Sequence, residues 1–401
     1  MTVPQAVLDR ERDFACAFRK AALRGVRLDR DQVEKLIAEH EEGRAVSQAR
    51  VAEATNGEIQ NPKSNAQVGP YLAATGRYQL PLSAKTGKPG AGKGVLEPYA
   101  YLGDTLCKDI LEYRRHDTAL GLHLEPRKLL LDRGDGRCRT TILTLAADTG
   151  RTSSRDLNLQ QVSRQGGMRA CHLADEGCLI VSADFSSVEV RVGAALSGDS
   201  GMQEMIRLGD LYPERKKEFD FHWRTAIQVW GQDATKENRY TAKRINFQKM
   251  YGGAPPGCAA NVGIPLEVAR RVFSAFEALA PGYVAWDREQ RRLARSGVRS
   301  YTAYSGRTIW LPRLAEHATG NYQIQGTARE LLVDAVARWR QGKWRDCTIV
   351  PVHDELLAFD VPEAEAEEAT AYLSWCMETE IGGVKIVAEA NKPSPWWLDA
   401  S

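Results

Sequence analysis

Residues 239–251, RYTAKRINFQKMY, place two cations and two aromatic rings at four-residue intervals. The four side chains are those of Arg239, Lys243, Phe247 and Tyr251, and in an α-helix this spacing puts them on roughly one face. Arg and Lys neutralise phosphate oxygens, and aromatic rings offer a surface on which a nucleobase can stack. The stretch therefore fits either a helix that binds a nucleoside triphosphate or an ordinary amphipathic helix with a basic rim.

Two carboxylates far apart in the sequence occupy similar settings. Asp184 ends the apolar run 179–183, and Asp354 lies where the apolar runs TIVPV and LLAF should turn into a hairpin. If these strands are neighbours in one sheet, the two carboxylates meet at its edge and can hold Mg²⁺ ions for phosphoryl transfer. A single Asp at a strand end is usually a turn residue or a helix cap. Two such residues together with the cationic helix favour the metal site.

The surrounding pattern predicts which elements position these groups. Helical spacing covers most of residues 1–60, where a long polar helix starts at a cap formed by Asp29 or Asp31 and ends near Gly57. A strand is predicted from about residue 139, the segment 153–163 reads as polar and irregular, and residues 200–300 read as mainly helical. A hairpin over 300–312 and an amphipathic helix from about residue 328 follow. This pattern predicts an α+β protein.

The composition is that of a soluble globular protein. With 401 residues, 43% of them hydrophobic and 26% charged, the chain can form a large core divided into two or three subdomains. No apolar run approaches the roughly 20 residues of a membrane helix, and the N-terminus lacks an apolar signal core. The eight cysteines include no CxxC pair, which favours reduced thiols in the cytoplasm and argues against a zinc site or a disulfide framework. With a net charge of only +2, any DNA binding must depend on local basic surfaces.

Six segments in order resemble the family A DNA polymerases, the bacterial DNA polymerase I type. ADFSSVEVR is similar to motif A (DYSQIELR), RYTAKRINFQKMYGG to motif B (RxxxKxxxFxxxYG), and VPVHDELLAF to motif C with its VHDE core. TGRTSSRDLNLQQV resembles TGRLSSxDPNLQNI, NYQIQGTARELL resembles NxPxQGTAADII, and YTAYSGRTIWLP resembles the GRRRxLP hairpin. Weaker similarity reaches back to FRKAALRGVRLD, so the resemblance covers nearly the whole chain.

The resemblance implies the roles of several residues. The metal ligands would be Asp184, Asp354 and the backbone carbonyl of Phe185, holding two Mg²⁺ ions, for which Mn²⁺ can substitute. The catalytic set would be Asp184, Asp354, Lys243 and Glu355, with Lys243 as the proton donor to pyrophosphate and Glu355 in support of the site. Contacts to the incoming dNTP would come from Arg239, Lys243, Phe247, Tyr251, Glu189, His222, Phe185 and Ser187. Among these, Glu189 would be the steric gate that excludes a 2′-hydroxyl.

A second implied set binds DNA. The primer-terminal minor groove would be read by Arg151, Gln325 and His353, and the duplex would be held by Asn158, Gln160 and Asn321. Two alternatives stay open: Glu189 could be a structural acid in a salt bridge, and His353 could be an ordinary turn residue. The chain departs from the family pattern at Phe185, Ser187, Gln248, Lys249, His317 and Pro351. None of these departures removes a catalytic carboxylate.

The implied fold is an α+β right hand with an antiparallel-sheet palm, helical fingers and a helical thumb. The palm would comprise residues 1–27, 121–200 and 313–401, the thumb 28–120 and the fingers 201–312. The resemblance begins close to the start of the chain, so the expectation is a stand-alone polymerase module of the phage or plasmid type, without an exonuclease domain. It would act as a cytoplasmic monomer on primer–template DNA and dNTPs, with replication accessory proteins as further partners and no membrane.

Two alternatives remain open from the sequence. A single-subunit RNA polymerase shares the palm chemistry and a similar cationic helix, although Phe247 and Glu189 argue against it. A non-catalytic DNA-binding replication factor is the second alternative, and it has no need of both Asp184 and Asp354.

Overall fold

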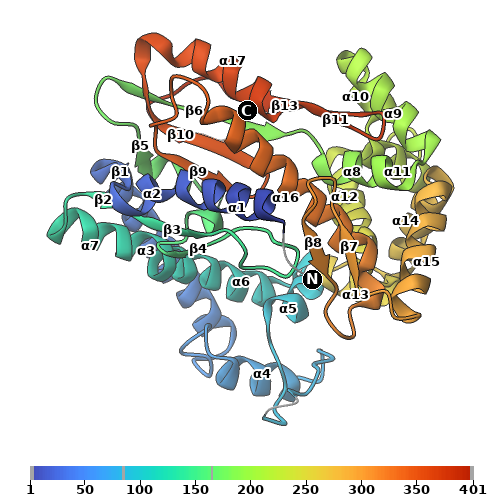
Figure 1. Cartoon of the computed structure of the whole chain (residues 1–401). Helices are drawn as coiled ribbons and strands as arrows, with labels where there is room; N and C mark the ends of the chain where they lie inside the picture. Colours follow the sequence, from blue (N-terminus) through green and yellow to red (C-terminus); the bar gives the residue numbers. More distant parts are fainter. Residues whose placement is uncertain (1–3, 84–85, 164–165, 398–401) are drawn as a thin grey trace.

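The sheet that carries both candidate carboxylates has four strands, and each neighbouring pair is antiparallel (Figure 1). This computed structural model describes residues 4–83, 86–163 and 166–397. The strands, in their order across the sheet, are β13 (Ala388–Ala390), β6 (Cys178–Phe185), β10 (Glu355–Pro362) and β9 (Ile349–Val352). Strands β9 and β10 form the predicted hairpin, and β6 lies beside β10.

Apolar side chains cover both faces of this sheet, which explains why its strands read as continuous apolar runs. On β6, Val181 and Ala183 belong to one hydrophobic core, whereas Ile180 belongs to another. On β10, Leu356 belongs to the first of these cores and its neighbour Leu357 to the second. Over the first face pack α8 (Val188–Ser197), α16 (Thr319–Trp339) and α17 (Ala366–Met377). The predicted amphipathic helix is the second half of α16, which begins nine residues earlier than expected because its first turns are also buried.

Two smaller sheets lie at the second core. One contains β1 (Val26–Leu28), β2 (Arg137–Cys138) and β5 (His172–Leu173), and the other pairs β3 (Thr140–Leu143) with β4 (Ser153–Asp156). The prediction that residues 153–163 are irregular is wrong for its first four residues. The polar sequence SSRD forms a strand because its backbone pairs with the more apolar β3, with Ile142 opposite Ser154.

A separate helical unit projects at the bottom of the view in Figure 1. Its long helix α3 (Arg30–Ala54) begins at Asp29, whose carboxylate accepts the Gln32 N–H at 3.0 Å, so the first of the two predicted caps is confirmed. The other helices of this unit are α4 (Asn65–Ala74), α5 (Lys93–Tyr101) and α6 (Thr105–Thr118). They surround a core of their own that includes Leu72 and Ile110.

A single helical run connects this unit to the sheet. Helix α6 passes directly into a π-helical turn, Ala119–Leu124, and then into α7 (Glu125–Arg133). Leu120 and Leu124 of the π-helical turn belong to the second core, beneath the sheet, whereas Ile110 of α6 belongs to the core of the projecting unit. The turn therefore lies at the boundary between two cores.

Helices dominate residues 200–295, as predicted (Figure 1). They are α9 (Ser200–Leu211), α10 (Lys216–Phe219), α11 (Phe221–Trp230), α12 (Lys236–Met250), α13 (Pro255–Val262), α14 (Leu266–Leu279) and α15 (Pro281–Arg295). The cationic and aromatic stretch is α12, which starts at a capping box between Thr235 and Asn238. The predicted hairpin is β7 (Ser300–Thr302) and β8 (Thr308–Trp310), with Gly306 at φ +84° in its turn. Within the described residues, no helix is long and apolar enough to cross a membrane.

The remaining elements border the main sheet. They are α1 (Gln5–Ala17), which packs on α16, together with α2 (Arg19–Leu23), β11 (Thr379–Ile381) and β12 (Val384–Ile386).

Candidate active site

The backbone segments that carry the two predicted carboxylates lie side by side at one edge of the main sheet. Asp184 is the penultimate residue of β6 and lies opposite Glu355, the first residue of β10. Asp354 precedes Glu355 in the β9–β10 turn, and its carbonyl oxygen accepts the N–H of Phe185 at 3.1 Å. Residues 170 positions apart in sequence are therefore on adjacent backbone segments. This is the arrangement that a shared cation site requires.

Strained backbone flanks both carboxylates. His353, one residue before Asp354, has φ +57°, and Ser187, three residues after Asp184, has φ +51°. A residue other than glycine in this left-handed region costs about 1–3 kcal/mol, and such residues cluster at functional sites. At Ser187 the strained conformation ends the strand and starts α8, which carries Glu189 in its first turn.

Glu189 joins three elements at this edge. It is 5% exposed, and its carboxylate accepts a hydrogen bond of 2.6 Å from the Tyr251 hydroxyl and one of 2.5 Å from the Arg151 guanidinium. The same guanidinium lies 3.6 Å from the Asp354 carboxylate. Burial would lower the pKa of Arg151, but the charges of Asp354 and Glu189 raise it overall. Burial and the charge of Glu189 also raise the pKa of Tyr251, so its hydroxyl stays a donor.

The cationic end of α12 lies against α11. Arg239 forms two hydrogen bonds, of 2.6 and 3.1 Å, with Asp220, the N-cap of α11. Lys243 lies 5.7 Å from the ring centre of Phe247, and its charge acts on His222. The ring of Phe247 in turn contacts His222, with 5.2 Å between ring centres. Three of the four predicted side chains of α12 thus gather around α11, and the fourth, Tyr251, reaches Glu189.

His222 is a neutral imidazole whose single N–H proton can be assigned to one ring nitrogen. Burial, together with the charges of Lys243 and Arg239, lowers its pKa to about 3, although Asp220 opposes this, so the ring is neutral. Its Nδ1 accepts the amide of Asn246 at 3.1 Å, which leaves the proton on Nε2. That Nε2 is buried and has no hydrogen-bond partner among the described residues. A buried N–H without an acceptor suits an anionic ligand.

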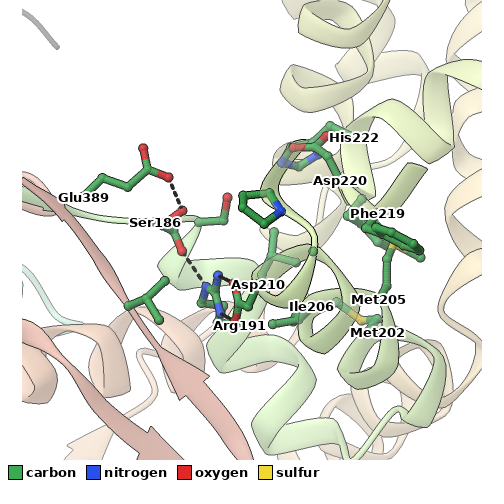
Figure 2. A pocket seen from close by; sticks show the side chains of 16 residues that line it. Ser186, Arg191, Met202, Met205, Ile206, Asp210, Phe219, Asp220, His222 and Glu389 are labelled. Atoms are coloured by element: carbon green, nitrogen blue, oxygen red, sulfur yellow. Dashed lines mark hydrogen bonds and ion pairs between the residues drawn. The ribbon is translucent and has the colours of Figure 1, made fainter. Parts of the chain in front are cut away.

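A cavity of about 330 Å³ lies between motif A and α11 (Figure 2). Ser186, Ser187 and His222 line its polar side. In Figure 2, Ser186 lies between Glu389, whose carboxylate accepts its hydroxyl at 2.9 Å, and Arg191, which donates to its carbonyl at 2.8 Å. The apolar side is lined by Val190, Met202, Met205, Ile206, Phe219 and Phe221. The cavity therefore connects two of the predicted nucleotide contacts, Ser187 and His222.

The donors at the sheet edge fit a hard divalent cation. Within the described residues no cluster of three His, Cys, Asp or Glu side chains is arranged to bind a metal. The predicted set contains two carboxylates and the carbonyl of Phe185, and such sparse oxygen ligation suits Mg²⁺, which keeps several waters for substrate phosphates. Arg151 beside Asp354 shows that this edge already accommodates positive charge.

Glu355 has a supporting position. It is 1% exposed, and its carboxylate accepts a hydrogen bond of 3.0 Å from Arg169. The Arg169 guanidinium lies 4.5 Å from the ring centre of Trp397. This buried pair connects the start of β10 to the C-terminal segment.

The predicted DNA-binding residues occupy different environments. A small cavity brings five of the predicted site residues together, namely Arg151, Gln160, Phe185, His353 and Asp354. Gln160 is largely committed to the protein itself, because its amide donates to Thr152 at 2.8 Å and to the Pro351 carbonyl at 3.0 Å. The side chain of Asn158 accepts a hydrogen bond from Ser154, and Asn321 and Gln325 are half-buried in the first half of α16.

The sequence did not predict the side chains that contact the predicted site residues and help to fix them in place. Arg169 and Asp220 are the partners of Glu355 and Arg239, and Arg329 lines the small cavity beside Arg151. Only Arg329 had a detectable signal, since it stands where the family pattern QGTAAD has its second alanine.

Comparisons with known proteins identify the relationship. The sequence profile of DNA polymerase family A matches residues 30–397. The chain belongs to the family A DNA polymerases. It is 32% identical over 266 residues to a "DNA polymerase" of Mycobacterium phage L5, covering 66% of this chain and 42% of that protein. It is 29% identical over 417 residues to "DNA polymerase I" of Lactococcus lactis subsp. cremoris, covering 97% of this chain and 45% of that protein.

The chain thus spans less than half the length of these two curated relatives. Its fold is similar to the "POL domain of Pol1 from M. smegmatis complex with DNA primer-template and dNTP", with a TM-score of 0.77 and 24% identity. That match covers 93% of this chain and 67% of the other. The α+β polymerase fold predicted from the sequence is confirmed.

Proposed function

We propose that this family A polymerase extends a DNA primer on a template, using dNTPs and two Mg²⁺ ions. The observation that carries the proposal is that the backbone segments of Asp184 and Asp354 are adjacent. Arg151 joins Asp354 to Glu189, and Glu189 is bonded to Tyr251 at the end of α12. The ions, held by the two Asp carboxylates and the carbonyl of Phe185, would activate the primer 3′-hydroxyl and stabilise the oxygen that departs with pyrophosphate. Mn²⁺ would substitute for Mg²⁺.

The protein's own groups would bind and orient the nucleotide. Lys243 and Arg239 would neutralise the triphosphate, and the Nε2–H of His222 would donate to one of its oxygens. Phe247 would pack against the sugar and the nascent base pair. A carboxylate held in two directions, as in Glu189, cannot move aside for a 2′-hydroxyl, so the gate would favour deoxyribonucleotides.

The remaining assignments belong to the same proposal. Arg151, Gln325 and His353 would contact the primer terminus, where correct base pairs present acceptors at equivalent places in the minor groove. The duplex would be held by Asn158, Gln160 and Asn321. Gln160 would do so indirectly, by fixing its own loop to the carbonyl of Pro351. The palm would be residues 1–27, 121–200 and 313–401, the thumb 28–120 and the fingers 201–312. The protein would act as a monomer in the cytoplasm, together with replication accessory proteins.

Primer extension with Mg²⁺ and four dNTPs tests the proposal. The Asp354→Asn variant keeps the shape of the side chain but loses its charge, and we expect extension to fall by at least about a thousandfold, since electrostatic stabilisation is usually the largest catalytic contribution. The matched control is Asp346→Asn, whose carboxylate is 81% exposed on the surface. A second arm supplies rNTPs alone, which the RNA polymerase alternative would use. Duplex binding without extension by the wild type would favour the non-catalytic alternative.

A further inference from the structure

The turn that delivers Arg151 to the site rests on two guanidinium groups. Arg307, at the β7–β8 hairpin, donates to the carbonyl of Thr149 at 3.2 Å, and Arg329 of α16 donates to the carbonyl of Gly150 at 3.1 Å. Gly150 has φ +83°, and a β-carbon there would lie 2.7 Å from the guanidinium nitrogens of Arg307. The last two carbonyls before Arg151 are therefore both held by charged donors.

Arg329 is in turn fixed by carboxylates on two other segments. It is 2% exposed, donates to Glu330 at 2.9 Å, and forms two hydrogen bonds with the carboxylate of Glu11 in α1. Its guanidinium also lies 4.9 Å from the ring centre of Phe14. Glu330 additionally accepts a 2.6 Å hydrogen bond from Arg307. One buried network therefore joins α1, α16 and the hairpin to the turn.

The geometry of this network depends on arginine. The planar guanidinium of Arg329 directs separate N–H groups at Glu11, Glu330 and the Gly150 carbonyl, which a lysine ammonium on a flexible stem cannot do from one point. A buried ion-pair network adds little net stability over well-packed apolar side chains, although removing one partner is costly. Its distinctive effect here is to fix the relative positions of the segments that it joins. Arg329 and Glu330 stand where the family pattern QGTAAD has alanine and aspartate.

We propose that Arg329, held by Glu11, is a positioning residue that sets the location of Arg151 between Glu189 and Asp354. The inference rests on the proposed function for its kinetic consequences. When the Gly150 carbonyl shifts, Arg151 loses its place against the gate carboxylate and the catalytic carboxylate together. Loss of Arg329 therefore changes sugar selection and the rate of incorporation, rather than stability alone.

The test compares Arg329→Lys and Glu11→Gln with Asp334→Asn. The control removes a charge from the same α1–α16 contact. Asp334 pairs with Arg10, which also binds Glu330, and it accepts the Tyr304 hydroxyl, but the carbonyls of Thr149 and Gly150 are held by Arg307 and Arg329 instead. We expect Arg329→Lys to lower kcat for dNTPs by about tenfold or more, the usual effect of losing a charge-assisted hydrogen bond. The preference for dNTPs over rNTPs should fall in parallel, while the melting temperature falls no more than in Asp334→Asn.

A double-mutant cycle with Arg151→Ala tests the route of the effect. If Arg329 acts through Arg151, Arg329→Lys has almost no further effect on kcat or on sugar selection in the Arg151→Ala background. Additive losses overturn the proposal, and so does wild-type selectivity in Arg329→Lys.

Amide hydrogen exchange provides a readout that does not depend on catalysis. In the wild type, the Gly150 N–H donates to the Ala147 carbonyl at 2.7 Å, so its exchange reports on the turn directly. We expect faster exchange over residues 147–151 in Arg329→Lys and in Glu11→Gln, but not in Asp334→Asn. Unchanged exchange overturns the inference. If wild-type protein fails to extend primers while this exchange pattern appears, the proposed function fails and the positioning of the turn stands.

Discussion

Replacing Tyr251 by Phe removes a single hydroxyl group from the contact between the end of α12 and Glu189, the carboxylate that we propose as the sugar gate. That hydroxyl donates at 2.6 Å to Glu189, which is 5% exposed. A hydrogen bond to a buried charged group contributes about 1.5–3 kcal/mol, which corresponds to roughly 10- to 150-fold in an equilibrium. Because Arg151 still holds the other oxygen of Glu189, the gate is loosened rather than lost. We therefore expect the preference for dNTPs over rNTPs to weaken by about tenfold.

The assay measures kcat/KM for a dNTP and for the matching rNTP on one primed template, together with the free energy of unfolding in denaturant. The control is Tyr240→Phe on the same helix, because the Tyr240 side chain is 60% exposed and lies away from Glu189. Its unfolding free energy should stay within about 0.5 kcal/mol of the wild type. If Tyr251→Phe leaves both stability and sugar selection unchanged, the hydrogen bond does not hold the gate and the reasoning is refuted.

Three other predictions concern charged or titratable groups. Glu189→Ala should increase rNTP incorporation relative to dNTP more strongly than Tyr251→Phe does, and unchanged selectivity would remove Glu189 from the gate. His222→Leu should raise the KM for dNTPs about tenfold through loss of one donor; since burial lowers the pKa of His222 to about 3, wild-type KM should show no His222 titration between pH 5 and 8. Burial opposes the ionisation of Glu330, but the charge of Arg329 and its other partners lower its pKa to about 2. The stability that ionised Glu330 contributes is complete above about pH 4.5 and is lost towards pH 2. We therefore expect the difference in unfolding free energy between the wild type and Glu330→Gln, measured in denaturant, to be about 3 kcal/mol smaller at pH 2 than at pH 6.

Local sequence was sufficient to predict the elements that present the chemistry. The apolar run before Asp184 and the paired runs around Asp354 predict strands because few other local structures bury so many consecutive apolar residues. The four-residue spacing from Arg239 to Tyr251 predicts a helix, and α12 spans Lys236–Met250 with Tyr251 as its C-cap. The meeting of the two strands was a condition of the metal-site hypothesis, and the register of β6 and β10 meets it.

Contacts between distant residues were beyond the sequence pattern. Glu11 and Arg329 are 318 positions apart, and nothing in the periodicity of either helix indicates that they pair. The carboxylate of Asp220 reads as a helix cap, which it is, but its second role as the partner of Arg239 depends on how α11 and α12 pack. Strand β4 is polar and forms because β3 lies beside it. Each of these outcomes depends on tertiary structure, which overrides local preference.

The π-helical turn at Ala119–Leu124 interrupts the helical run that leads from residues 105–118 to α7. Each residue added to or removed from an α-helix rotates everything beyond it by about 100° and shifts it by 1.5 Å along the axis. A single π-helical turn accommodates an extra residue locally, because its hydrogen bonds span five residues rather than four. The six residues of this turn therefore take up the irregularity at the boundary between two cores, so that Ile110 and Leu120 each stay in their own core along one continuous helical run.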